Sequence, residues 1–103
     1  MIYIKKYNTD NGVMLAMCDA DLIDKVLKDG DIEINIKDYS DFYKGELVDS
    51  KNAKSIINAE GIQSANVIGK ESVGAAIENS IIEETHVKRI KNVPYAQAYS
   101  TKY

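Results

Sequence analysis

The stretch "MIYIKKYNTDNGVMLAMC", residues 1–18, decides the fold that the sequence predicts. Its first half alternates apolar and polar side chains and places Ile2 and Ile4 on one face, which is typical of a strand with one buried side. Asn11-Gly12 then predicts a hairpin turn, because both residue types tolerate a positive φ. The nearly apolar run after the turn predicts a return strand that is covered on both faces. The chain is therefore expected to open with an antiparallel strand pair.

Beyond this hairpin the sequence predicts helices between further strands. Asp19 or Asp21 offers a capping carboxylate and Gly30 a stop, and an apolar stripe at helical spacing lies between them: Leu22, Ile23, Val26 and Leu27. The later elements are a strand at 31–36, a loop or irregular strand pair at 37–50, a helix capped by Asp49 or Ser50 and ended by Gly61, a strand at 64–69, a helix at 70–82, and strands at 86–90 and 92–100.

This order predicts an α+β protein, because strands come as hairpins at both ends with helices between them. We expect a two-layer sandwich in which a mostly antiparallel mixed sheet carries about three helices packed on one face. A length of 103 residues is typical of one compact domain, residues 1–103. The residues expected in its core are Ile2, Ile4, Leu15, Leu22, Val26, Ile34, Ile57, Val67 and Ile77.

The last predicted strand has two different faces. Tyr95, Gln97 and Tyr99 share one face, whereas Ala96 and Ala98 share the other and are small enough for a helix to lie close. We expect Gly74 and Ala75 to form that helix contact. The only proline, Pro94, predicts that the strand begins at a sheet edge or at a turn.

The polar face of that strand has two interpretations. If the first and last strands are neighbours, Tyr3 and Tyr7 extend it into a tyrosine face edged by Lys5. Tyrosines on neighbouring strands stabilise sheets, so the face could be purely structural. It could equally stack bases or dock a protein.

Charge is distributed unevenly along the chain. The net charge is −3, yet all acidic residues lie between Asp10 and Glu84, and the two ends outside residues 8–85 carry six cations and no acid. Such ends can form a basic face for an anionic partner. They can also be edge strands whose lysines prevent aggregation.

Composition argues against several classes of protein. The single cysteine, Cys18, allows no internal disulfide, and neither a signal peptide nor an apolar run of membrane-spanning length occurs. We therefore expect a cytoplasmic protein with no membrane contact. The one histidine, His86, has no neighbouring ligand, so no metal site, cofactor or catalytic set is predicted.

The stretch "VIGKES", residues 67–72, resembles a phosphate-binding loop but lacks its required residues. Ser64 stands where that loop needs glycine, and Glu71 stands where it needs Ser or Thr. What remains is a strand–Gly–Lys–helix junction at which Gly69 should have a positive φ or lie against another segment. Free N–H groups and Lys70 could hold an anion there.

Four pieces of sequence resemble an archaeal family, the domain-of-unknown-function family number 424. They are "MCDADL" at 17–22, Phe42-Tyr43 with Gly45, "ANVIG" at 65–69 and "NVPYAQ" at 92–97, and the likeness spans residues 1–99. The resemblance implies an archaeal cytoplasmic protein with a two-layer α/β sandwich and no established activity. In that family Tyr95 often corresponds to histidine and Asn92 to glycine, which argues against a catalytic imidazole here.

Two functional hypotheses follow. The first is a non-catalytic binding module for RNA, a ribonucleoprotein or another protein, with Tyr95, Gln97 and Tyr99 on its contact face. The alternative is a small enzyme that binds an anionic substrate near the 66–71 junction. Its candidate binding residues are Tyr43, Asn66, Gly69 and Lys70.

Overall fold

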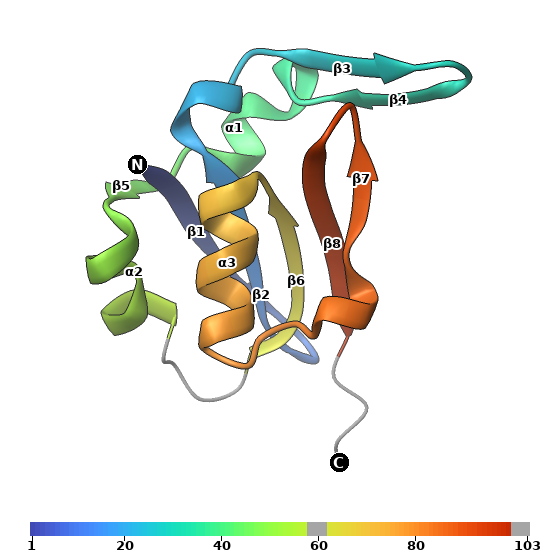
Figure 1. Ribbon diagram of the computed structural model, residues 1–103. Coiled ribbons are helices and arrows are strands. Elements are labelled where there is room, and N and C mark those ends of the chain that lie inside the picture. Colours follow the sequence, from blue (N-terminus) through green and yellow to red (C-terminus); the bar gives the residue numbers. More distant parts are fainter. Residues whose placement is uncertain (58–61, 100–103) are drawn as a thin grey trace.

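A computed structural model describes residues 1–57 and 62–99, which form one six-stranded sheet and one small two-stranded sheet (Figure 1). The large sheet has the order β5-β1-β2-β6-β8-β7. Its central strands β2 and β6 run parallel, whereas all its other described pairs are antiparallel. The strands are β1 (Ile2–Thr9), β2 (Gly12–Asp19), β5 (Glu46–Val48), β6 (Ile62–Ile68), β7 (Lys88–Ile90) and β8 (Val93–Tyr99).

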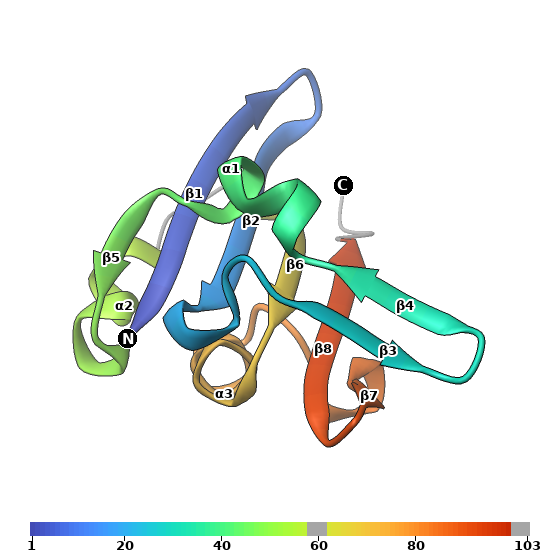
Figure 2. The ribbon, with the colours of Figure 1, turned by 90° about the horizontal axis from the view of Figure 1, so that it is seen from above.

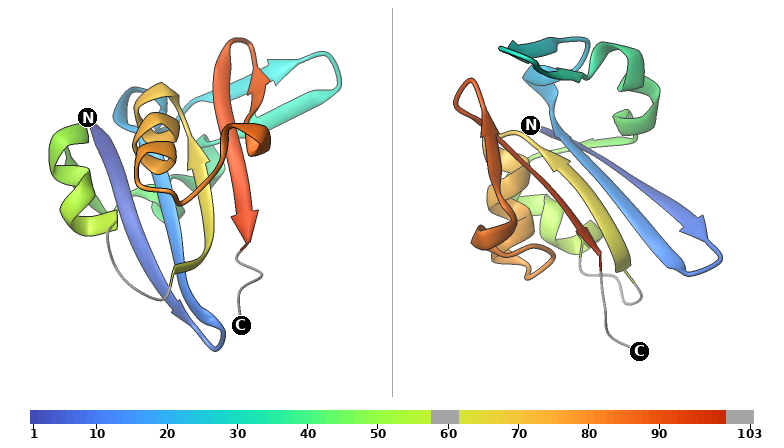
Figure 3. Two further views of the ribbon diagram at one scale, coloured as in Figure 1. Left: turned by 60° about the horizontal axis from the view of Figure 1, so that its bottom comes forward. Right: turned by 90° about the vertical axis from the view of Figure 1, so that its right-hand side faces the viewer.

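Helices lie on both faces of this sheet. α2 (Ser50–Ile57) and α3 (Lys70–Glu78) cover one face, and the short α1 (Ser40–Tyr43) lies on the opposite face (Figure 3). The predicted α+β class with a mixed, mostly antiparallel sheet is confirmed. The expected single helical face holds for α2 and α3 but not for α1, because Phe42 of α1 packs on Tyr7, whose side chain points away from them. Within the described residues, none of the helices has the length and apolar character needed to cross a bilayer.

The prediction of a helix between Asp19 and Gly30 is wrong. A single 3-10 turn at Ala20–Leu22 is followed by a hairpin of β3 (Val26–Asp29) and β4 (Ile32–Asn35), which extends beside the sheet (Figure 2). Asp24 adopts a φ of 67°, which no α-helix allows, and Gly30 has a φ of 61° at the first position of the two-residue turn. The apolar stripe fits helical spacing, but the chain uses Leu27 and Ile34 as a pair on one face of the hairpin.

The other predicted elements hold with shifted bounds. Segment 37–50 contains a 3-10 turn at Lys37–Tyr39 and the elements α1 and β5. Asp49 caps α2, since its Oδ1 accepts the Asn52 N–H at 2.8 Å. The third helix ends at Glu78 rather than at 82. Gly61 and residue 100 lie outside the described residues.

The core consists of two clusters, one on each face of the sheet. The larger lies under α2 and α3, and the smaller joins Cys18, Leu22, Ile36 and Ile68 beneath the β3–β4 hairpin. Six predicted core residues are buried: Ile2, Ile4, Leu15, Leu22, Ile57 and Val67. Ile34 and Ile77 are half-buried. Val26 is 46% exposed, so its placement in the core was wrong; the hairpin turns it away from the sheet.

Strand β8 has the two faces that its sequence predicts. Ala96 is buried in the larger cluster with Ala75, whereas Tyr95 packs against the smaller cluster on the other face. Gly74 makes no close contact, contrary to expectation, because it lies on the exposed side of α3. β8 begins after a tight turn whose two residues, Lys91 and Asn92, both have positive φ. The strand that contains Pro94 therefore begins at a turn, which is one of the two starts that the sequence predicted.

The first and last strands are not neighbours. β2 and β6 lie between β1 and β8, so Tyr3 and Tyr7 do not extend the polar face of β8 as the sequence suggested. The order of strands in a sheet is set by pairings between distant segments, which a single sequence does not reveal.

Candidate functional site

A groove lies on the sheet face opposite α2 and α3, over strands β6 and β8. It consists of two adjoining hollows of about 300 and 220 Å³ that share Tyr43, Asn66 and Gln97. We call it the tyrosine groove, defined by the side chains Ile34, Tyr39, Phe42, Tyr43, Asn66, Ile68, Tyr95 and Gln97. α1 and β4 supply one wall, and the two strands supply the floor.

Packed aromatic rings hold the α1 wall in place. The ring of Phe42 stacks on Tyr7 of β1 with centroids 5.1 Å apart, and it meets Tyr43 edge-on at 5.0 Å. The Tyr7 hydroxyl donates to the Phe42 carbonyl oxygen at 2.7 Å. Because ring packing and a hydrogen bond fix the same segment, the wall is a preformed surface rather than a loose loop.

Tyr43 and Tyr39 present different chemistry to the groove. Tyr43 is half-buried, and burial raises the pKa of its hydroxyl to about 12, with a smaller contribution from Cys18. At neutral pH this hydroxyl therefore stays protonated and can donate a hydrogen bond but cannot act as a base. Tyr39 is 63% exposed at the rim, so its ring is available to a ligand.

The floor carries a pair of side-chain amides. Asn66 and Gln97 are register partners on β6 and β8, which brings their side chains to the same face. Gln97 Nε2 donates to Asn66 Oδ1 at 2.8 Å, and Asn66 Nδ2 lies 3.8 Å from the sulfur of Met14 on β2. The pair gives the floor neutral donors and acceptors between aromatic walls.

Tyr95 borders the groove next to a cation. It is the register partner of Lys88 on β7, so the lysine lies on the groove side of the sheet. Arg89 pairs with Pro94 instead and faces the side of α3. Among the described residues, none of the side chains that line the groove is charged.

The strand–helix junction holds an anion from the chain itself. Asp19 at the end of β2 accepts the Ser72 N–H at 2.8 Å and the Glu71 N–H at 3.1 Å, so its carboxylate caps α3. Gly69 has a φ of 110° and lies against this carboxylate, and both parts of its prediction are confirmed. Asp19 does cap a helix, but a helix far along the chain rather than the one expected next to it.

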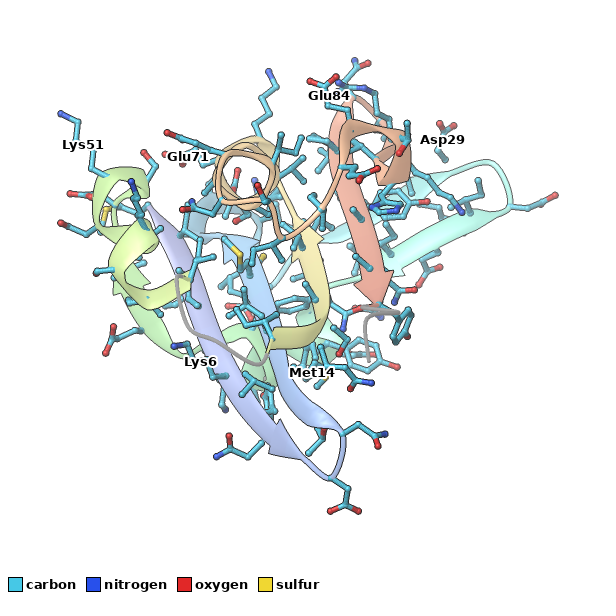
Figure 4. The ribbon with its side chains drawn as sticks, turned by 90° about the horizontal axis from the view of Figure 1, so that it is seen from below. Lys6, Met14, Asp29, Lys51, Glu71 and Glu84 are labelled. Atoms are coloured by element: carbon cyan, nitrogen blue, oxygen red, sulfur yellow. The ribbon has the colours of Figure 1, made fainter. Side chains whose placement is uncertain are left out.

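Burial governs the ionisation of Asp19. Only 6% of the residue is exposed, and this burial raises the pKa of its carboxyl, while hydrogen bonds from Ser72 and Glu71 oppose the rise. The nearby Glu71 carboxylate raises it further. Glu71 itself pairs with the N-terminal amine at 3.0 Å on the side of α2 and α3 (Figure 4). An external anion at this helix start would have to displace Asp19.

The candidate residues therefore do not form one site. Tyr43, Asn66, Tyr95 and Gln97 line the groove, but Gly69 is buried against Asp19. Lys70 is exposed on α3 and lines two hollows beside that helix, on the opposite side of the sheet. Tyr99 is 72% exposed and lines a separate hollow with His86.

Sequence reasoning did not assign groove roles to Tyr39, Phe42 and Ile34. Tyr39 and Phe42 lie in segment 37–50, whose lack of a clear period gave no indication of where its side chains point, whereas Ile34 was assigned to the core. The uneven spacing of aromatic residues in "YSDFY" was the one available signal. Across residues 1–57 and 62–99, acidic, histidine and cysteine side chains form no group of three that could hold a metal.

Comparisons with known proteins agree with this fold. A solved structure titled "Crystal structure of an uncharacterized conserved protein from Methanopyrus kandleri" is similar with a TM-score of 0.78 and 22% sequence identity, covering 95% of this chain and 90% of that one. At this identity the likeness shows the fold. A search of curated proteins finds no match. The family model described as "Protein of unknown function (DUF424)" matches residues 7–101. Since this match spans nearly the whole length, the chain belongs to the DUF424 family.

Proposed function

We propose that the chain is a non-catalytic binding module of the archaeal cytoplasm and that its tyrosine groove binds single-stranded RNA. One observation carries the proposal: Tyr43, Asn66, Tyr95 and Gln97 come from α1, β6 and β8 and line one groove of rings and neutral amides. Single-stranded RNA is recognised by stacking of bases on aromatic rings and by hydrogen bonds to base edges. An archaeal origin is supported by the Methanopyrus neighbour.

The charge beside the groove supports a nucleic-acid ligand. Lys88 borders Tyr95, Lys91 lies in the following turn, and no acidic residue occurs beyond Glu84. Bases would lie in the neutral groove, and phosphates would meet these cations at its edge. Each neutralised phosphate releases condensed counterions, so affinity should fall as salt rises.

The chemistry of the groove supports binding rather than catalysis. Its deepest titratable group is the Tyr43 hydroxyl, whose pKa of about 12 keeps it protonated at neutral pH. The nearby thiol of Cys18 is buried, and burial, followed by the charges of Asp19 and Asp21, raises its pKa to about 12. Neither group is suited to act as a base or nucleophile. The alternative enzyme site at 66–71 has less support, because Asp19 fills its anion position.

Fluorescence anisotropy with labelled single-stranded RNA tests the proposal at low and moderate ionic strength. Tyr39→Ala should weaken binding about fivefold or more, because stacking contributes about 1–3 kcal/mol per base. Tyr99→Ala is the matched control, since both tyrosines are exposed but only Tyr39 borders the groove. Tyr95→Ala should abolish binding, with circular dichroism to verify that this half-buried site still folds.

Two results would overturn the proposal. One is the absence of binding at high micromolar protein in low salt. The other is an equal loss in Tyr39→Ala and Tyr99→Ala, which would place the contact outside the groove.

A further inference from the structure

We infer that the tyrosine groove selects adenine among the bases of single-stranded RNA, through the amide of Gln97 held in place by Asn66. This inference rests on the proposed function and adds its base specificity. It starts from the hydrogen bond in which Gln97 Nε2 donates to Asn66 Oδ1 at 2.8 Å.

That bond leaves one N–H donor and the carbonyl oxygen of the Gln97 amide unused within the described residues. A glutamine amide carries two N–H donors and one carbonyl oxygen, and the bond to Asn66 occupies a single N–H. One donor and one acceptor of an exposed side chain therefore remain available at the groove floor. Such an amide edge can make two parallel hydrogen bonds to one partner.

Asn66 orients this edge. It is half-buried between β2 and β8, and its Nδ2 lies against the Met14 sulfur at 3.8 Å. With Asn66 in contact with Met14 on the neighbouring strand, its Oδ1 holds the Gln97 amide in one orientation. Less rotamer freedom is then lost when a ligand binds, which favours a ligand that matches the exposed edge. Asn66 is thus a positioning residue, and Gln97 is the reading residue.

When a base is read at its N7 edge, the available amide matches adenine better than guanine. Adenine presents its N6 amino donor beside its N7 acceptor, and Asn or Gln amides pair with this edge through two hydrogen bonds. Guanine presents two acceptors, N7 and O6, at the same edge, which calls for Arg or Lys. The described side chains that line the groove include neither.

The flanking rings favour a purine over a pyrimidine. Tyr43 and Tyr95 belong to the same hollow as Gln97, one from α1 and the other from β8. A purine offers a larger π-surface to such rings than a pyrimidine does, and stacking energy grows with that surface. Stacking therefore favours the two purines, and matching at the N7 edge selects adenine between them.

The test uses nine-nucleotide oligouridine and the same strand with its central base replaced by adenine, guanine or cytosine. The wild-type chain should bind the adenine strand about fivefold or more tightly than the other three. Gln97→Met keeps the side-chain length but removes the amide, so the affinities for the adenine and guanine strands should fall within about twofold of each other, and only the purine preference from stacking should remain. Asn66→Ala should reduce the preference by freeing the Gln97 amide.

Gln63→Met is the matched control, because Gln63 lies on β6 in a different hollow and should keep the adenine preference. Equal wild-type affinity for all four strands would overturn the inference and leave the proposed function standing. A preference for adenine over guanine that survives in Gln97→Met would also overturn it. Absence of binding to every strand would instead overturn the proposed function itself.

Discussion

Gly69 lies directly against the carboxylate of Asp19: a methyl group on the Gly69 α-carbon would overlap the Asp19 carboxyl group. The contact joins the end of β2 to the start of α3, the helix that this carboxylate caps. A side chain at position 69 would also be strained by the φ of 110°. Backbone strain and steric overlap thus both favour glycine there.

Gly69→Ala should lower the free energy of unfolding by at least about 2 kcal/mol, because strain and overlap add. Gly74→Ala is the control within the same helix region: a methyl group there would meet no other atom within 4 Å, so the change should instead stabilise the chain by about 0.5–1 kcal/mol. Urea unfolding measures both. Equal midpoints for Gly69→Ala and the parent would contradict the proposed contact.

Leu22→Ala should cost about 2–5 kcal/mol of stability, since Leu22 is buried in the smaller core cluster and its loss leaves a cavity. Val26→Ala should change stability by no more than about 0.5 kcal/mol, because that side chain is exposed on the hairpin. Thermal or urea unfolding of the two variants compares them. A large cost at both positions would favour the helix that the sequence suggested over the observed hairpin.

Asp19→Asn should change how stability depends on pH. Burial raises the pKa of Asp19 in the folded chain above its ordinary 3.8, so the folded chain binds this proton more tightly than the unfolded chain. The carboxyl therefore contributes stability that is fully present below pH 3.8 and is lost as pH rises through the folded pKa. The variant also loses one cap hydrogen bond, which lowers its free energy of unfolding by about the same amount at every pH.

Parallel urea titrations of the parent and Asp19→Asn from pH 3 to 7 measure this effect. The stability of the parent relative to the variant should decline as pH rises above about 3.8. A difference that stays constant with pH, or that grows in favour of the parent, would mean that burial does not control this carboxyl.

Cys18 should resist thiol reagents in the folded chain. Its side chain is fully buried, and its pKa of about 12 leaves almost no thiolate at pH 8. A colorimetric disulfide reagent should therefore modify it only after unfolding in guanidinium, which serves as the positive control. Rapid, stoichiometric reaction of the native chain would show that this end of β2 opens readily.

Local signals in the sequence predicted the fold where neighbouring residues determine it. The β1–β2 hairpin, the Asp49 cap and the strained Gly69 all depend on a few adjacent residues. The helix prediction for segment 20–30 failed because its short apolar set fits both a helix and a hairpin, and Gly30, interpreted as the helix stop, instead occupies the first position of a hairpin turn. The order of strands in the sheet was not predicted, because it depends on contacts between distant strands.

For the candidate site, too, the sequence predicted only the features that belong to a single strand. Alternation in β8 placed Tyr95 and Gln97 on one face, since that period is a property of a single strand. The convergence of Asn66 and Tyr43 with them required the β6–β8 register and the position of α1, which are tertiary features. For the same reason, sequence alone did not separate Lys70 and Tyr99 from the groove.

The parallel β2–β6 pair at the centre of the sheet has a consequence for the speed of folding. Its partners, such as Ala16 and Asn66, are about 50 residues apart, whereas the β1–β2 and β7–β8 hairpins close over two-residue turns. Closing that long loop costs chain entropy before its contacts form, so we expect this pairing to limit the folding rate. Substitutions at Met17 or Val67 should then slow refolding, whereas those in the edge strand β5 should mainly speed unfolding.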